Sequence, residues 1–218
     1  MSSILDLSCE LTGNRSLVHD KLISIQTADC KRPLQVPRTL LTAASPLFEK
    51  ALDKRFKEGQ ECALRFTETD HATVMSFLYW LFNGRQLHCT ASDQDARAIS
   101  QAQLQDIKLW IFADKYFLDQ LRDAAMVDLK EKLVLQYPNA TLVRKIFDGT
   151  TTDSPLRQVV LKEIVFGMRS RAKGDKTAGF SVEELEKLMN VSGFAAGLTD
   201  ELSKYLVRLS WEEMATIR

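Results

Sequence analysis

The sequence predicts an α+β protein with short strands in its first third and helices elsewhere. Residues 22–25 and 62–66 are strand-like runs, and the second alternates apolar and polar residues as a half-buried strand does. Most other segments repeat apolar residues every three or four positions, which indicates helices. Beyond Pro138 only this helical period is found, so we expect a helical C-terminal region after the mixed part of the chain.

The first strands and helices are expected to follow one another in short segments. Residues 34–36 predict a return strand for the run at 22–25, with a polar connection at 28–33 between them. Ser45 and Pro46 supply an N-cap and a first-turn proline for a helix. Seven apolar residues on the helical stripes of this and later segments are expected in the core: Leu47, Phe48, Leu52, Phe77, Leu81, Ile111 and Leu121.

Longer helices are predicted in the middle of the chain. Thr69 or Asp70 can cap a helix that ends at Gly84. The polar segment 86–103 has few large apolar residues, so we expect an exposed loop there. Leu104 restarts the helical pattern, which continues as two helices up to the proline at position 138.

The C-terminal part carries several helix-start signals. The basic segment 169–179 is expected to be a solvated linker, because Asp175 interrupts it and no aromatic residues are interleaved. The expected helix starts are N-caps at Asn139 and Ser154, and capping boxes at Ser181 with Glu184 and at Ser210 with Glu213.

Composition and charge argue against several classes of protein. Lys plus Arg and Asp plus Glu both number 29, so net charge gives no reason to expect nucleic acid or an anionic membrane as a partner. The densest apolar run, residues 77–82, is far too short to span a bilayer. Asp6 and Glu10 do not fit a signal peptide. We therefore expect a soluble intracellular protein, in the cytoplasm or the nucleus.

Residues for catalysis or for a cofactor do not form a recognisable pattern. The histidines lie in separate segments, and neither a nucleophile elbow nor a glycine-rich phosphate loop accompanies them. We therefore expect no enzymatic activity, no catalytic residues, no metal and no cofactor. The cysteines form no C-x-x-C pair and are expected to be free thiols: Cys9, Cys30, Cys62 and Cys89.

Several short motifs occur in the order in which one known family has them. They are Asp20 at the start of a strand, Arg-Thr-Leu-Leu at 38–41, Ser-Pro-Leu-Phe at 45–48, Phe-Lys-Glu at 56–58, FLYWLFNGR at 77–85 and Ala-Asp-Lys-Tyr at 113–116. Over about half its length the chain thus resembles the BTB/POZ family, and in particular its fungal branch. The segment 148–157, DGTTTDSPLR, also resembles one that follows fungal BTB domains. Pro37 departs from the family pattern, which has His at that position.

The resemblance implies a fold and a class of function. It implies a BTB/POZ domain at residues 17–136, a short sheet covered by helices, followed by a helical C-terminal region at 137–218. Residues 1–16 would be either an N-terminal arm that reaches across a dimer or a loose tail. The family is an interaction module, so protein–protein interaction is the expected function.

The first pair of site residues implied by the resemblance is Asp20 and Arg38. In the family these positions meet in a charged pocket under the dimer interface, and an Asp buried at a strand start needs such a positive neighbour. The alternative is two exposed charges that never meet. The pocket favours a self-associating scaffold, a homodimer, as the function.

The second pair is Phe56 and Glu58. In family members that serve as substrate adaptors of cullin-based ubiquitin ligases, an apolar-x-Glu element at this place helps dock the cullin. The alternative is that Phe56 fills the core of the domain and Glu58 is solvated. Cullin docking requires part of the Phe56 ring to be exposed, because a partner gains apolar burial only from accessible area.

Overall fold

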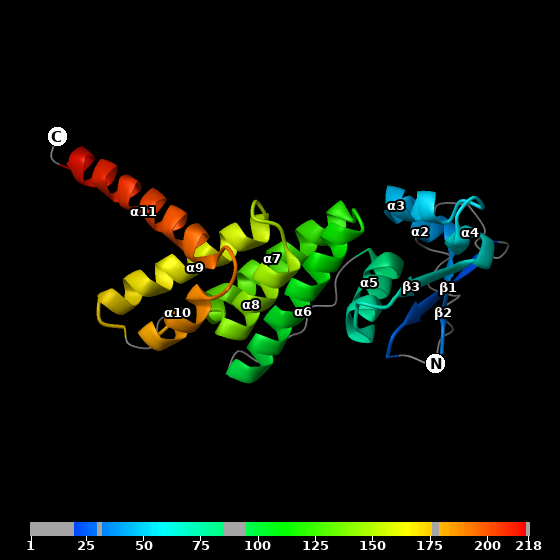
Figure 1. Cartoon of the computed structure of the whole chain (residues 1–218), viewed down its shortest axis with the longest axis horizontal. Coiled ribbons are helices and arrows are strands. Elements are labelled where there is room, and N and C mark those ends of the chain that lie inside the picture. Colours follow the sequence, from blue (N-terminus) through cyan, green and yellow to red (C-terminus); the bar gives the residue numbers. More distant parts are fainter. Residues whose placement is uncertain (1–19, 30–31, 85–94, 176–178, 217–218) are drawn as a thin grey trace. The chain divides into compact units, whose positions relative to one another are not determined.

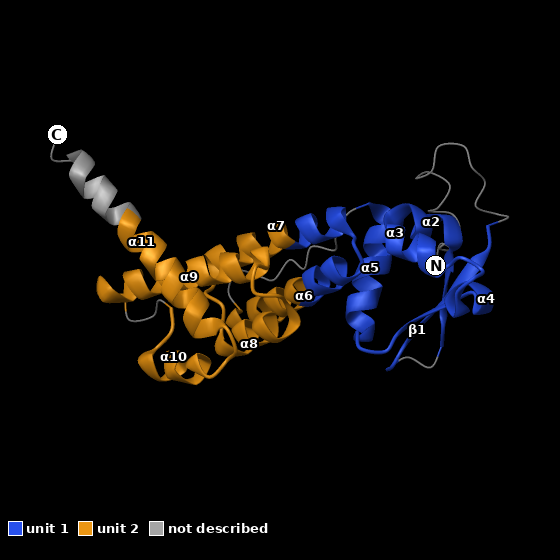
Figure 2. Ribbon diagram, turned by 45° about the horizontal axis from the view of Figure 1, so that its top comes forward, with its two compact units in different colours: residues 1–89, 108–125 blue, residues 90–107, 126–218 orange. Residues whose placement is uncertain are grey.

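The computed structural model of the chain describes residues 20–29, 32–84, 95–175 and 179–216. It has an α+β fold with a three-stranded sheet and, in these ranges, ten helices (Figure 1). The chain forms two compact units: Met1–Cys89 with Lys108–Ala125, and Thr90–Ile107 with Met126–Arg218 (Figure 2). The boundary expected near residue 136 does not coincide with this division, because two long helices contribute residues to both units. Residues 1–16, expected to be either an N-terminal arm or a loose tail, lie outside the described ranges.

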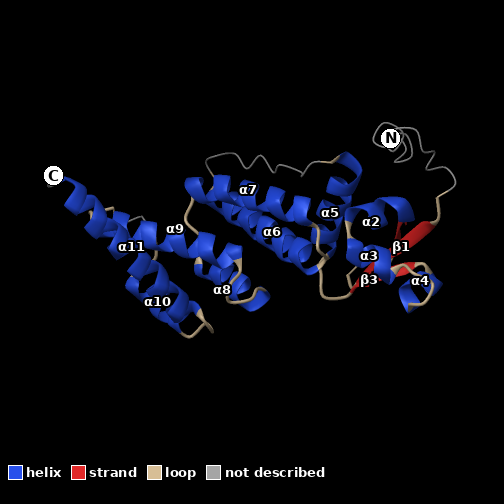
Figure 3. Cartoon of the chain, turned by 90° about the horizontal axis from the view of Figure 1, so that it is seen from above, coloured by secondary structure: helices blue, strands red, loops and turns tan. Residues whose placement is uncertain are grey.

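The sheet of the first unit, whose strands are red in Figure 3, has the order β2-β1-β3. Its strands are β1 (Leu22–Thr27), β2 (Leu34–Pro37) and β3 (Ala63–Phe66). β1 runs antiparallel to β2, with Ile23 opposite Val36, and parallel to β3, with Ile25 opposite Leu64. These four side chains are buried, so most of the apolar residues predicted for the strands face the core, whereas Leu22 is exposed.

Four helices accompany the sheet in sequence, and two of the predicted caps are confirmed. The Ser45 hydroxyl accepts hydrogen bonds from the backbone N–H groups of Leu47 and Phe48, at 3.1 and 3.4 Å. Asp70, rather than Thr69, caps the later helix by accepting from the Thr73 N–H at 2.9 Å. The helices are α2 (Arg38–Ala44), α3 (Pro46–Ala51), α4 (Lys57–Glu61) and α5 (His71–Asn83).

A cluster of aromatic rings fills the core of the first unit. Phe48 is 1% exposed, and its ring centroid lies 5.4 Å from that of Tyr116 and 6.0 Å from that of Phe77. Phe66 and Phe112 complete the cluster. Of the residues expected in the core, four are buried and three are only partly buried: Phe48, Leu52, Phe77 and Leu121 in the first group, Leu47, Leu81 and Ile111 in the second.

The loop expected at 86–103 is wrong from residue 96 onward. α6 (Ala96–Lys115) begins there and is followed by α7 (Asp119–Leu135). Gln103 is buried because its amide nitrogen donates to the carbonyl oxygens of Lys132 and Gln136, at 3.1 and 2.7 Å. The last carbonyl groups of a helix have no N–H donor within the helix. The Gln103 amide supplies donors at the end of α7, which explains why a polar side chain is buried there. Residues 85–94 lie outside the described ranges.

The C-terminal region is helical, as expected. Asn139, Ser154 and Ser181 each cap a helix, and Ser181 with Glu184 forms the predicted capping box. The prediction of a separate helix starting at Ser210 is wrong, because one continuous helix passes through this residue. Neither Gly nor Pro occurs between residues 198 and 216 to end that helix. The helices are α8 (Ala140–Gly149), α9 (Pro155–Ala172), α10 (Val182–Met189) and α11 (Phe194–Thr216).

The basic segment at 169–179 is partly helical. Arg169 and Arg171 belong to the last turn of α9, where positive side chains interact favourably with the helix dipole. Across the described ranges, none of the helices combines the length and apolar character that crossing a membrane requires.

Candidate protein-interaction surface

Phe56 lies in the turn between α3 and α4, and its side chain is 51% exposed. It is the N-cap residue of α4, with the extended backbone that this position requires. Glu58, in the first turn of α4, is half-buried and has no ion-pair partner among the described residues. The Phe-Lys-Glu element therefore offers accessible apolar area next to an uncompensated carboxylate.

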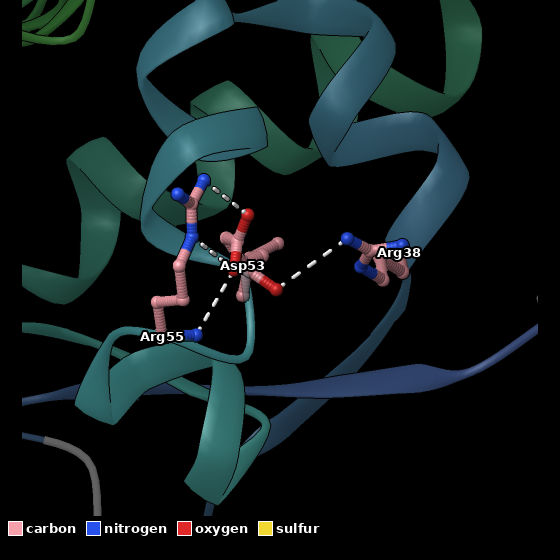
Figure 4. Close-up of polar contacts among 4 residues, drawn as sticks. Arg38, Asp53 and Arg55 are labelled. Carbon is pink, nitrogen blue, oxygen red and sulfur yellow. Dashed lines mark hydrogen bonds and ion pairs between the residues drawn. The ribbon is translucent and has the colours of Figure 1, made fainter.

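Asp53 fixes the turn that precedes Phe56. Its carboxylate accepts hydrogen bonds from the Arg55 backbone N–H at 2.9 Å and from the guanidinium Nε and Nη2 atoms at 3.1 and 2.9 Å (Figure 4). The Asp53 carbonyl oxygen accepts from the Phe56 N–H at 2.9 Å. The hydrogen bonds from the Arg55 side chain lower the pKa of Asp53 below its ordinary value. Local bonds thus hold the backbone that presents Phe56.

Gly59 brings α4 into direct contact with this turn. A Cβ atom at Gly59 would lie 2.1 Å from the Asp53 carbonyl oxygen and 2.8 Å from the Leu52 carbonyl carbon. Only a residue without a side chain permits this approach. Gly59 therefore positions Phe56, a role that the sequence analysis missed although the glycine directly follows Phe-Lys-Glu.

The other end of α4 is joined to the sheet by charged side chains. Glu61 pairs with Arg65 of β3 at 2.7 Å, and Arg65 also donates from Nε to the Gln26 amide oxygen of β1 at 3.2 Å. The hydrogen bond from Arg65 lowers the pKa of Glu61. α4 is thus held at its middle by the close approach of Gly59 and at its end by Glu61.

The expected ion pair between Asp20 and Arg38 is wrong: none joins them in the described ranges. The Arg38 Nη2 atom donates instead to the Leu52 carbonyl oxygen at 3.4 Å, and Figure 4 shows Asp53 between the side chains of Arg55 and Arg38. The guanidinium thus lies at the end of α3, where its charge also contributes to the lowered pKa of Asp53.

Asp20 has a different partner. Its Oδ2 atom accepts from the Thr39 N–H at 2.8 Å, in the first turn of α2. The N-cap residue of α2 is Pro37, whose side chain cannot accept this bond, so Asp20 caps the helix in its place.

No group of three or more potential metal ligands occurs in the ranges that the structure describes. Comparison with known proteins adds no assignment: no protein-family model matches the chain, and no curated protein matches it significantly. The BTB/POZ family therefore stays a proposal that depends on the motifs and on the geometry described above.

Proposed function

We propose that this chain is a protein–protein interaction module of the BTB/POZ type, and that α4 with its preceding turn forms a partner-binding surface. The observation that carries this proposal is the half-exposed Phe56 at the N-cap of α4, two residues before Glu58 in the first turn. A large aromatic side chain at the surface, held by a rigid turn, is the kind of residue that dominates the energy of protein interfaces. The bonds of Asp53 and the close approach of Gly59 provide that rigidity.

The spatial arrangement of the family motifs supports the BTB/POZ part of the proposal. Ser45 and Phe48 belong to the Ser-Pro-Leu-Phe motif, and Tyr116 belongs to the Ala-Asp-Lys-Tyr motif. The Ser45 hydroxyl donates to the Tyr116 carbonyl oxygen at 2.6 Å, and the rings of Phe48 and Tyr116 stack. Two motifs that are far apart in sequence therefore contact each other, as parts of one domain core would.

The first candidate partner is a cullin. A substrate adaptor of a cullin-based ubiquitin ligase needs an accessible Phe56 ring, and this residue is about half exposed. Such a partner would bury the ring against an apolar part of a helix. In this role the chain would bring a substrate to the ligase and would have no catalytic residues of its own.

The second candidate function is the self-associating scaffold. Among the described strands, β2 lies at an edge of the sheet, and an edge strand can pair with a strand of another copy. Leu22, opposite Pro37 of β2, is exposed and adds apolar area near this edge. We place this candidate second because Asp20 and Arg38 do not pair, and the implied dimer pocket depended on that pair.

Binding to a purified cullin N-terminal domain tests the first candidate. We expect the full chain to bind it, and Phe56→Ala or Glu58→Ala to weaken binding by about tenfold while the fold survives. Met75→Ala, which truncates another exposed side chain of the same unit, is the matched control and should leave binding unchanged. Absence of binding at tens of micromolar, near the weak end of specific association, would reject cullin docking. Sedimentation equilibrium of the full chain tests self-association independently.

A further inference from the structure

Phe117 has an unusual backbone conformation at the end of α6. Its φ angle is +53°, in the left-handed region. Its N–H donates to the Asp114 carbonyl oxygen at 3.3 Å, and the N–H of Leu118 donates to the Ala113 carbonyl oxygen at 2.9 Å. These two bonds form the Schellman motif that ends many helices, and the left-handed position in that motif is usually glycine. A bulky residue is disfavoured there.

The Phe117 side chain is packed only in part against its own unit, so packing offsets this cost only partly. It is 58% exposed, whereas the neighbouring Leu118 is buried. Tyr116, the residue before Phe117, belongs to the five-ring cluster of the core. Among the described rings, none packs against Phe117 itself. Among the described residues, therefore, no ring contact accounts for an aromatic residue at this position. Residues with strained backbone cluster at sites that serve function.

Phe117 and Phe56 lie near opposite ends of α3. Tyr116, the residue before Phe117, accepts the hydrogen bond from Ser45, the N-cap of α3. Asp53, which holds the turn before Phe56, directly follows the C-cap of the same helix. α3 has six residues, which correspond to a rise of about 9 Å. A partner helix of a few turns is long enough to reach both ends.

The surface around Phe117 carries excess negative charge. Asp114, Asp119 and Asp123 share one guanidinium, that of Arg122, at 3.5, 3.0 and 3.8 Å. All three carboxylates are more than half exposed. One positive charge cannot neutralise three negative ones, so the rim of Phe117 favours a partner with basic side chains.

We propose that Phe117 is a partner-contacting residue, and that its ring binds the same partner helix that docks on Phe56. The partner segment would be an amphipathic helix with an apolar residue against Phe117 and lysine or arginine beside it. This inference rests on the proposed docking function. It adds a second aromatic contact to the surface and requires basic side chains on the partner helix.

The test combines binding and stability for Phe117→Gly in the full chain. The probe is the purified cullin N-terminal domain. Binding should weaken about tenfold, as for an interface hot spot, while the midpoint of urea unfolding should rise because glycine is favoured at this backbone position. Phe117→Asn, which also tolerates the left-handed region, should act in the same direction. Met75→Ala serves as the exposed-residue control and should change neither quantity.

The outcomes separate this inference from the function on which it rests. Wild-type chain that fails to bind the cullin domain rejects the docking function itself. Wild-type binding that Phe117→Gly leaves unchanged rejects only the role of Phe117. A fall in the unfolding midpoint together with a loss of binding also rejects that role, because it would make Phe117 a structural residue. Asp123→Lys should weaken binding several-fold at low salt and less at high salt, and an unchanged affinity would reject the basic partner helix.

Discussion

The Ser45 hydroxyl donates a hydrogen bond to the Tyr116 carbonyl oxygen at 2.6 Å, although the two residues are 71 positions apart. The Ser45 Oγ atom also accepts from the N–H groups of Leu47 and Phe48 and so caps α3. One side chain thereby fixes both the start of α3 and the end of α6. Ser45 thereby ties Phe117, which directly follows Tyr116, to the N-terminal end of α3, while Phe56 lies beyond the C-terminal end of the same helix.

Replacing Ser45 with Ala should destabilise the protein by about 1–3 kcal/mol. The change removes the cap of α3 and leaves the part-buried Tyr116 carbonyl oxygen without its donor. Urea unfolding at neutral pH measures the free energy. Ser203→Ala is the matched control, because that hydroxyl is exposed and bonds only within α11, so its loss should cost less than about 0.5 kcal/mol. Equal effects of the two changes would contradict the double role of Ser45.

Phe48→Ala should cost roughly 3–5 kcal/mol, the range for large aromatic truncations in a core. Phe48 contacts three rings of the cluster and is almost fully buried. Phe56→Ala removes the same atoms from a half-exposed site and should cost less than about 1.5 kcal/mol. The two unfolding free energies, measured side by side, test the distinction between a core ring and an interface ring. A larger loss for Phe56 would make that residue structural.

Gly59→Ala should destabilise the protein by about 1–3 kcal/mol, because the new Cβ atom overlaps backbone that cannot rotate away. It should also weaken partner binding, since α4 must shift relative to Asp53. Gly197→Ala offers a comparison: its Cβ atom would lie 2.9 Å from the flexible end of Leu161, which can move. We expect the smaller loss at Gly197, again from urea unfolding. The reverse order would show that the turn before Phe56 is not rigid.

The Asp53 carboxyl should titrate below the ordinary value for aspartate in the folded protein. The hydrogen bonds from Arg55 favour the charged form, which lowers the pKa. A pKa lowered by folding adds stability that is present above the unfolded-state value and is lost as pH falls through the folded-state value. Its contribution therefore disappears in the acid range, below about pH 4. NMR titration of the side-chain carboxyl measures the pKa directly, and Arg55→Ala should return it toward the ordinary value. A pKa unaffected by Arg55→Ala would contradict the assigned cause.

The sequence predicted those parts of the fold that depend on local signals. Strand alternation and the caps at Ser45, Asn139 and Ser181 are short-range patterns, and the structure confirms them. Gln103 was placed in a loop because its burial depends on carbonyl oxygens at the end of another helix, about thirty positions later in the chain. Its polarity alone gave no sign of those partners.

The candidate site was predicted only in part, for the same physical reason. Phe56 and Glu58 were found from a motif, but the approach of Gly59 to the turn at Asp53 follows only from the packing of α4. Asp20 was predicted to pair with Arg38, but it accepts a hydrogen bond from the Thr39 N–H instead. This bond depends on the lack of a capping side chain at Pro37, the N-cap residue of α2. Phe117 escaped notice because a Schellman end normally has glycine, and phenylalanine gives no such signal.

Arg157 should be the most sensitive charged residue of the C-terminal helices. Its buried guanidinium lies 4.5 Å from the centre of the Phe147 ring and donates to the carbonyl oxygens of Phe147, at 2.6 Å, and Thr150. These acceptors lie at the end of α8 and would remain buried without donors in Arg157→Leu. Because hydrogen bonds from a charged group are worth about 1.5–3 kcal/mol each, we expect a loss of at least about 2 kcal/mol in the free energy of unfolding. Arg157→Lys should recover little of this free energy, since an ammonium lacks the planar fork of donors.

Arg144→Leu, at an exposed arginine with one long bond to Lys187, is the control and should cost less than about 0.5 kcal/mol. Similar losses for Arg157→Leu and Arg144→Leu would mean that the end of α8 does not need the guanidinium.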